Sequence, residues 1–132
     1  MLNARDHRLG SPMRRILILA AALALATPAL ATPQHLCGWI ENPTPANWWL
    51  TDKSGEWIIG VQGGHQAEGD LPDFDIGKQY WVKTQPNGHG YGCACIDAEV
   101  DAATREVATV VKTKVMRLGV CRRDRALKEP KE

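Results

Sequence analysis

The sequence predicts an all-β domain: a small antiparallel β-barrel or rolled sheet of about six strands, stapled by disulfides and preceded by a signal peptide. Three observations favour this class. Short apolar or alternating segments are separated by turn residues after residue 31. Those segments are rich in β-branched and aromatic side chains, which prefer strands. All four cysteines lie in the 101 residues from 32 to 132, a size at which disulfides often supplement a small core.

The first 31 residues have the layout of a secretory leader. A basic stretch at 13–15 precedes an unbroken apolar or small run at 16–26, and residues 29–31 read Ala-Leu-Ala, a signal-peptidase pattern. The run is shorter than the roughly 20 apolar residues that a membrane span needs. We therefore expect cleavage after about Ala31 and a periplasmic or secreted product without a stable membrane span. Whether the chain starts at Met1 or Met13 stays open.

The expected elements follow in order along the rest of the chain. Strands are expected at 36–41, 48–51, 56–62, 80–84, 91–101 and 106–116. The polar turn at 52–55 ends in glycine and predicts a hairpin, and Asn87-Gly88 predicts the turn before the fifth strand. A glycine-rich loop occupies 63–77. Residues 122–132 are charged, so we expect a disordered tail behind a single domain at 32–121.

The last two strands need a choice, because residues 101–111 could also form a helix. The β-branched residues between 107 and 115 favour a strand. We expect Val100 to lie opposite Val107. The further pairs would be Ala98 with Thr109, Ile96 with Val111 and Ala94 with Thr113. This register makes one face largely apolar and places Cys93 and Cys95 on the mixed, charged face.

The cysteines at 37, 93, 95 and 121 allow three pairings. Joining Cys93 to Cys95 would close a strained ring, so we expect each of them to pair with Cys37 or Cys121, in either combination. A Cys-x-Cys redox site or a thiolate metal site is the alternative. Because there is neither Cys-x-x-Cys spacing nor a paired Cys/His set, we expect no metal and no cofactor.

Charge excludes one class of partner. The whole chain carries 16 basic and 15 acidic residues, a net charge of +1, and the 101 residues after the leader carry 12 and 14, a net charge of −2. A protein that binds nucleic acid through its phosphates needs a basic surface. We therefore expect no nucleic-acid partner.

Two tryptophans are the first candidate binding residues. Neighbouring strand residues point to opposite faces, so Trp48 and Leu50 belong with the core while Trp49 points outward. In the same way Tyr80 and Val82 group together and leave Trp81 on the outside. An exposed indole can stack on a sugar ring or anchor a protein partner. The alternative is that a small two-sided structure or its loops bury both.

The glycine-rich segment 63–70 is the second candidate. Its glycines permit close approach of a ligand beside His65, Gln66 and Glu68. His65, Glu68 and Asp70 could instead act as acid and base, which makes a small hydrolase or metal-dependent enzyme the alternative function. Carboxylates at 70, 73 and 75 could bind calcium, but the full calcium-loop pattern, including its distal glutamate, is missing. A solvated loop is the simplest interpretation.

Four motifs resemble those of a small exported bacterial family catalogued as domain of unknown function 4087. They lie at residues 37–39, 42–50, 59–69 and 91–95 and extend over nearly all of the chain after the leader. The resemblance implies an exported single-domain protein and brings no activity, ligand or catalytic residue.

The sequence therefore favours a non-catalytic binding module for a cell-envelope protein or glycan. Trp49, Trp81 and the 63–70 loop would hold that partner, since no nucleophile–base signature is present. The oligomeric state stays open.

Overall fold

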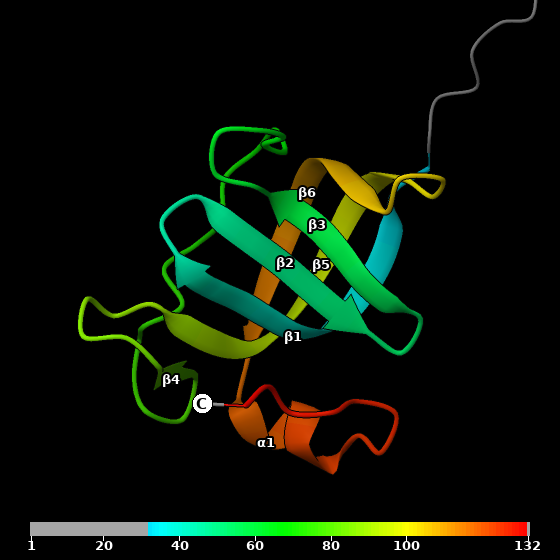
Figure 1. Cartoon of the computed structure of the whole chain (residues 1–132). Coiled ribbons are helices and arrows are strands. Elements are labelled where there is room, and N and C mark those ends of the chain that lie inside the picture. Colours follow the sequence, from blue (N-terminus) through cyan, green and yellow to red (C-terminus); the bar gives the residue numbers. More distant parts are fainter. Residues whose placement is uncertain (1–31, 132) are drawn as a thin grey trace, which may run out of the picture.

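The computed structural model describes residues 32–131, so the expected leader and its cleavage site lie outside the described residues. All six expected strands are present (Figure 1). They are β1 (Gln34–Thr44), β2 (Asn47–Asp52), β3 (Gly55–Gly60), β4 (Trp81–Lys83), β5 (Gly90–Asp101) and β6 (Glu106–Met116). A short helix that was not expected, α1 (Leu118–Arg123), follows β6. No helix in the described range is long and apolar enough to cross a membrane.

The sheet closes on itself, which makes it a barrel rather than an open rolled sheet. Its strand order is β1-β2-β3-β6-β5-β4, and β1 also pairs with β5, so five strands form a ring. The pairings are antiparallel except at the β3–β6 seam, where Ile58 lies opposite Glu106. Without β4, this order and its parallel seam are those of a five-stranded Greek-key barrel of the OB type. The short β4 adds to the start of β5, where β6 no longer reaches.

Polar turns hold the hairpins at this seam. In the turn between β2 and β3, the Asp52 carboxylate accepts hydrogen bonds from the Ser54 amide and hydroxyl. Arg105, in the turn between β5 and β6, donates to the Glu56 carbonyl, and its guanidinium lies 3.7 Å from the centre of the Trp57 ring. This cation–π contact ties the last hairpin to β3.

The expected register of the last hairpin is correct only near its turn. Val100 does lie opposite Val107, but the pairing then shifts at two irregularities, between Asp97 and Ala98 and between Glu99 and Val100. The observed pairs are Ala98 with Val110, Ile96 with Thr113 and Ala94 with Val115. Such bulges increase strand bending and twist, which a small barrel needs in order to close. The expected apolar face is confirmed for β5, where Ala94, Ile96 and Ala98 are fully buried. It is wrong for β6, because the shift buries Val110 in the barrel and leaves Val111, the expected partner of Ile96, 56% exposed.

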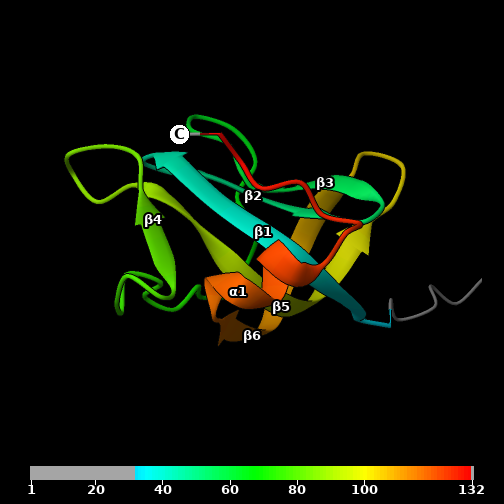
Figure 2. The same cartoon turned by 90° about the horizontal axis from the view of Figure 1, so that it is seen from below.

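Two apolar clusters lie on opposite faces of the sheet. The barrel interior contains Leu36, Ile40, Leu50, Trp57, Ile59, Phe74, Trp81, Ala94, Ile96, Ala98, Val107 and Val110. The second cluster lies outside the barrel, between the sheet and α1, and contains Trp39, Tyr91, Cys93, Leu118 and Cys121 (Figure 2). The Trp39 and Tyr91 rings meet edge to face at 5.5 Å.

The chain after Cys121 packs against the domain, and the expected disordered tail is not observed over residues 122–131. Arg122 makes a two-pronged ion pair with Glu129 at 2.8 and 2.9 Å, and the Tyr91 hydroxyl donates to the same carboxylate. Leu127 packs on the outer cluster. The apolar residues that dock this segment are Leu118 and Leu127. They lie in a stretch that is mostly charged, and the charged composition predicted disorder instead.

The two disulfides follow the expected scheme and decide the combination that the sequence left open. Cys37 is joined to Cys95, and Cys93 to Cys121. Two disulfides in a domain of this size are typical of an oxidising, extracellular environment.

Candidate functional site

The residues predicted to bind a partner do not meet in one place. Trp49 lies on the outer face of the sheet, half-buried, directly opposite Glu41 on β1. Its indole Nε1–H donates to the Glu41 carboxylate at 2.9 Å. Burial raises the pKa of Glu41, the hydrogen bond from Trp49 lowers it, and the charge of Glu56 raises it further.

The expectation that Trp81 points outward is wrong. Only 6% of its surface is exposed, and its ring belongs to the barrel interior. Trp81 lies opposite Gly92 on β5, where a Cβ would come within 2.9 Å of the indole. The missing side chain at Gly92 therefore makes room for the ring, and the indole Nε1–H donates to the Gly88 carbonyl at 2.8 Å.

His65 and Gln66 make contacts that hold the loop to the barrel. His65 Nε2 lies 2.8 Å from the Val107 carbonyl oxygen, which can only accept, so this nitrogen carries the hydrogen. The Gln66 amide donates to the carbonyls of Ala46 and Val61. Both polar groups are thus used within the fold.

The rest of the loop forms part of the barrel wall. The Glu68 backbone pairs with β6, because its amide donates to the Ala108 carbonyl and its carbonyl accepts from the Val110 amide. Gly69 has φ +92°, and a Cβ there would lie 2.3 Å from the Val110 carbonyl oxygen. Glu68 and Asp70 are exposed. Among residues 32–131, the potential metal donors that lie together are those of His35, Cys37 and Cys95 instead, and two of them are joined in a disulfide.

An open pocket lies at one end of the barrel, and we call it the barrel-end pocket. Its volume is about 320 Å³. It is lined by Asn42, Trp48, Pro72, Asp73, Phe74, Asp75, Trp81, Asn87, Gly88 and His89. The strand pattern places Trp48 with the core, and no pattern in the sequence points to Phe74 as a site residue. The segment 72–75, which carries the chain's single phenylalanine, was the available signal.

Three aromatic rings converge at this pocket. Phe74 stacks on Trp81 with ring centres 5.8 Å apart and planes 23° apart, and Trp48 packs at 5.6 Å from Phe74 and 6.4 Å from Trp81. Phe74 and Trp81 are buried, whereas Trp48 is half-buried. The pocket therefore has an apolar, aromatic floor.

The polar edge of the barrel-end pocket is held by a hydrogen-bond chain. The buried Asn42 donates its amide to the carbonyls of Thr44 and Asn47. Its Oδ1 then accepts from Nδ1 of His89. Neutral imidazole carries one hydrogen, so Nε2 of His89 is left as an acceptor.

Two carboxylates complete the edge. The Asp73 carboxylate accepts the Asp75 amide at 2.9 Å, and Asp75 forms a salt bridge with Lys83 at 3.1 Å. The lining thus combines aromatic faces with hydrogen-bonding groups, an arrangement that can hold a small ligand with one apolar and one polar side.

Comparison with known proteins gives a family. No curated protein and no solved structure matches the chain. The family model described as "Protein of unknown function (DUF4087)" matches residues 31–128, which include the barrel, both disulfides and most of the docked C-terminal segment. The chain belongs to the DUF4087 family.

Proposed function

We propose that this protein is an exported, non-catalytic binding domain that holds one ring of a cell-envelope glycan in the barrel-end pocket. Export is supported by the leader-like pattern at residues 1–31 and by two disulfides, which are typical of oxidising compartments. The partner class follows from the pocket.

The observation that carries the proposal is the aromatic floor formed by Trp48, Phe74 and Trp81. A sugar ring has apolar C–H faces and hydroxyl groups around its edge, so it fits an aromatic surface bordered by hydrogen-bonding groups. The volume of about 320 Å³ is near the lower limit of the roughly 300–1,000 Å³ typical of ligand pockets. Such a pocket suits a single ring better than a long chain segment.

The charge of the barrel-end pocket indicates which class of sugar it can bind. Asp73 and Asp75 line it, and Lys83 is already paired with Asp75. The excess of carboxylates disfavours an anionic ligand such as a uronic acid. Neutral or amino sugars are therefore the expected ligands.

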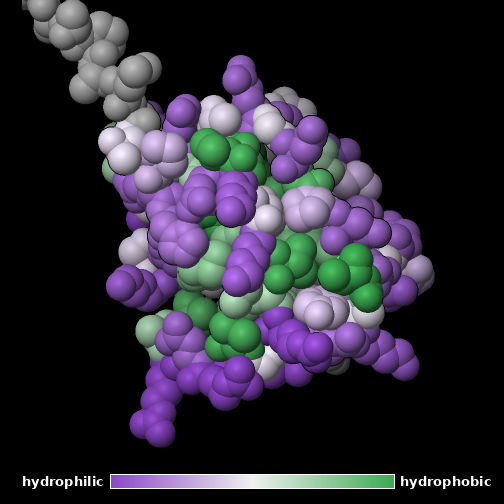
Figure 3. Space-filling model, turned by 180° about the vertical axis from the view of Figure 1, so that it is seen from behind, coloured by the Kyte–Doolittle hydropathy of each residue, from purple (hydrophilic) through white to green (hydrophobic). Residues whose placement is uncertain are grey.

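The surface supports a small ligand more than a broad protein interface. On the face seen from behind, apolar side chains are interspersed with hydrophilic ones (Figure 3). The large apolar residues that are exposed in the described range are Val61, Ile76, Val111 and Val120. A docking face for a protein usually has a contiguous apolar centre.

The test is titration calorimetry with oligomers of N-acetylglucosamine, with oligogalacturonic acid as the anionic comparison. We expect Trp48→Ala to weaken binding of the N-acetylglucosamine oligomer roughly two- to tenfold, since a ring contact contributes roughly 0.5–1.5 kcal/mol. Trp49→Phe, on the outer face, is the matched control and should bind normally. Asn87→Ala tests the exposed edge without touching the core.

Circular dichroism establishes that each variant is folded. The proposal is wrong if the folded protein binds neither oligomer, or if folded Trp48→Ala binds as tightly as the unchanged protein. Equal loss in Trp48→Ala and Trp49→Phe would also contradict it, because these side chains lie on opposite faces of β2.

A further inference from the structure

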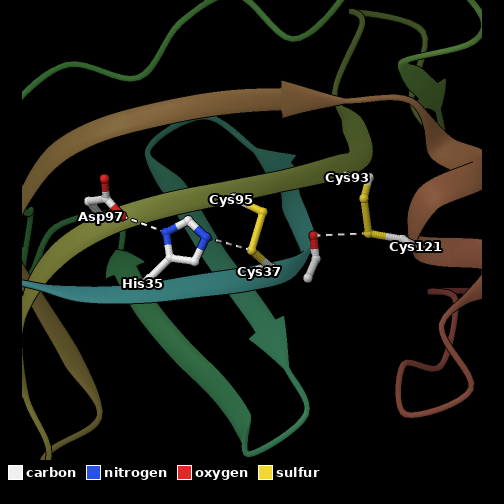
Figure 4. The surroundings of a disulfide bond; sticks show 7 residues. His35, Cys37, Cys93, Cys95, Asp97 and Cys121 are labelled. Atoms are coloured by element: carbon white, nitrogen blue, oxygen red, sulfur yellow. Dashed lines mark hydrogen bonds and ion pairs between the residues drawn. A yellow bond between two sulfur atoms is a disulfide. The ribbon is translucent and has the colours of Figure 1, made fainter.

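The pairing of β1 with β5 brings four reactive side chains together on the outer face of the barrel. His35 lies directly opposite Asp97, and Cys37 directly opposite Cys95. Residues two apart on a strand share a face, so the two pairs are neighbours. Figure 4 shows the imidazole between the Asp97 carboxylate and the Cys37–Cys95 disulfide.

The two disulfides of this chain differ in their access to solvent. Cys93 and Cys121 are 2% and 3% exposed in the cluster beneath α1, and Cys121 Sγ is 3.3 Å from the Gly38 carbonyl oxygen. Cys37, by contrast, is exposed and Cys95 is half-buried. A dissolved thiol can therefore reach the Cys37–Cys95 bond without unfolding the domain.

His35 lies where it can exchange a proton with the Cys37 sulfur. Its Nδ1 lies 2.6 Å from an Asp97 carboxylate oxygen, and its Nε2 lies 3.3 Å from Cys37 Sγ. Because Asp97 can only accept, Nδ1 carries a hydrogen and Nε2 faces the sulfur. Nε2 donates a proton when the ring is charged and accepts one when it is neutral. A sulfur, a base and a group that orients the base are the parts that activate a cysteine.

Other charges surround this group. Lys112 and Lys114 of β6 lie opposite Asp97 and Cys95. Asp52, Lys53 and Asp124 line the cavity that His35 and Cys37 share. The lysine beside Cys95 favours a thiolate there, as cations do for cysteines in general.

We propose that Cys37–Cys95 is a thiol–disulfide exchange site that oxidises an external dithiol, with His35 as its proton donor and acceptor. A thiolate of the dithiol attacks Cys95 Sγ and forms a mixed disulfide. The Cys37–Cys95 bond breaks, its electron pair goes to Cys37 Sγ, and His35 Nε2 protonates that sulfur. The second thiol then attacks the mixed disulfide and releases Cys95. Two electrons and two protons pass from the dithiol, which leaves as a disulfide, to Cys37 and Cys95. This activity is independent of the barrel-end pocket.

The experiment treats the purified, disulfide-bonded protein with limiting dithiothreitol, traps thiols with N-ethylmaleimide and maps them by mass spectrometry. Cys93–Cys121 is the internal control. We expect Cys37 and Cys95 to be labelled at least tenfold faster than Cys93 and Cys121 while circular dichroism stays unchanged. Labelling of both pairs at one rate would overturn the proposal, because it would mean that reduction follows unfolding.

Variants of His35 distinguish proton transfer by this residue from simple solvent exposure of the Cys37–Cys95 disulfide. We expect His35→Ala to slow reduction of Cys37–Cys95 about tenfold or more, since general acid catalysis contributes at least about that much. His35→Gln keeps an N–H near the sulfur but cannot transfer its proton, so it should not restore the rate. Asp124→Asn, in the same cavity without contact to sulfur, is the matched control and should react normally. An unchanged rate in folded His35→Ala refutes the assignment.

Discussion

Removing the Cys93–Cys121 disulfide is the perturbation whose magnitude the structure fixes best. The bridge closes a loop with a sequence separation of 28 residues. The chain-entropy relation for such a loop gives about 3.6 kcal/mol at 25 °C. Cys93→Ala with Cys121→Ala should lower the free energy of unfolding by at least this amount, because both cysteines are also buried in the outer cluster with Trp39 and Leu118.

The second disulfide provides the comparison. Cys37–Cys95 closes a separation of 58 residues, for which the same relation gives about 4.2 kcal/mol. The two loops share only residues 93–95, so their contributions should be nearly independent. Together they approach about 8 kcal/mol, which is comparable to the roughly 5–15 kcal/mol total stability of a typical domain. The fully reduced protein should therefore be largely unfolded.

Urea unfolding followed by circular dichroism measures the effect. With a slope of about 1.5 kcal/mol/M, a loss of 3.6 kcal/mol lowers the midpoint by roughly 2.4 M. The Cys37→Ala/Cys95→Ala variant is the control for loss of a bridge without loss of buried packing. A decrease below about 1 kcal/mol in Cys93→Ala/Cys121→Ala would refute the reasoning, since α1 would then be held by apolar contacts alone.

Three further predictions concern the barrel wall and its outer face. Gly38→Ala should prevent folding or cost several kcal/mol, because its Cβ would lie 2.0 Å from the Thr51 carbonyl oxygen; a folded variant with an unchanged urea midpoint contradicts this. Burial raises the pKa of Glu41, so the stability that its protonated form contributes is fully present below its unfolded pKa and is lost as pH rises through the folded pKa. Glu41→Gln should therefore have the same melting temperature as the unchanged protein at pH 3 and a higher one at pH 7. Equal melting temperatures at both pH values would count against this prediction. The hydrogen bond from Arg122 lowers the pKa of Glu129, so the stability that the Glu129 carboxylate contributes is present above its unfolded pKa and is lost as pH falls through the folded pKa. Glu129→Gln should lower the free energy of unfolding by about 1 kcal/mol or less at pH 7 and speed trypsin cleavage after Lys128. Unchanged cleavage would argue against a docked C-terminal segment.

Much of the fold could be predicted because its signals are local. Alternation, β-branched residues and turn residues act within a few positions, so the six strands and the hairpin at 52–55 follow from the sequence. The disulfide scheme also followed, because Cys93 and Cys95 are too close in the chain to pair without strain. The inward face of β5 was predicted correctly for the same reason of alternation.

The candidate sites depended on contacts that local patterns do not contain. Trp81 is buried because Gly92, eleven positions later, leaves space for its ring. Phe74 and Trp48 meet Trp81 only when the barrel closes. No local pattern marks His35 as a site residue, because its partner Asp97 is 62 positions away in the sequence.

The sequence by itself determined the strands, the face that each cysteine of β5 takes, and the pairing of each central cysteine with an outer one. Tertiary structure decided that the sheet closes into a barrel, which cysteine joins which, where the hairpin register shifts, and that residues 122–131 dock on the outer cluster. The physical reason is that strand formation depends on neighbouring residues, whereas closure, burial and the juxtaposition of His35, Asp97 and the disulfide depend on β1 meeting β5 across most of the domain.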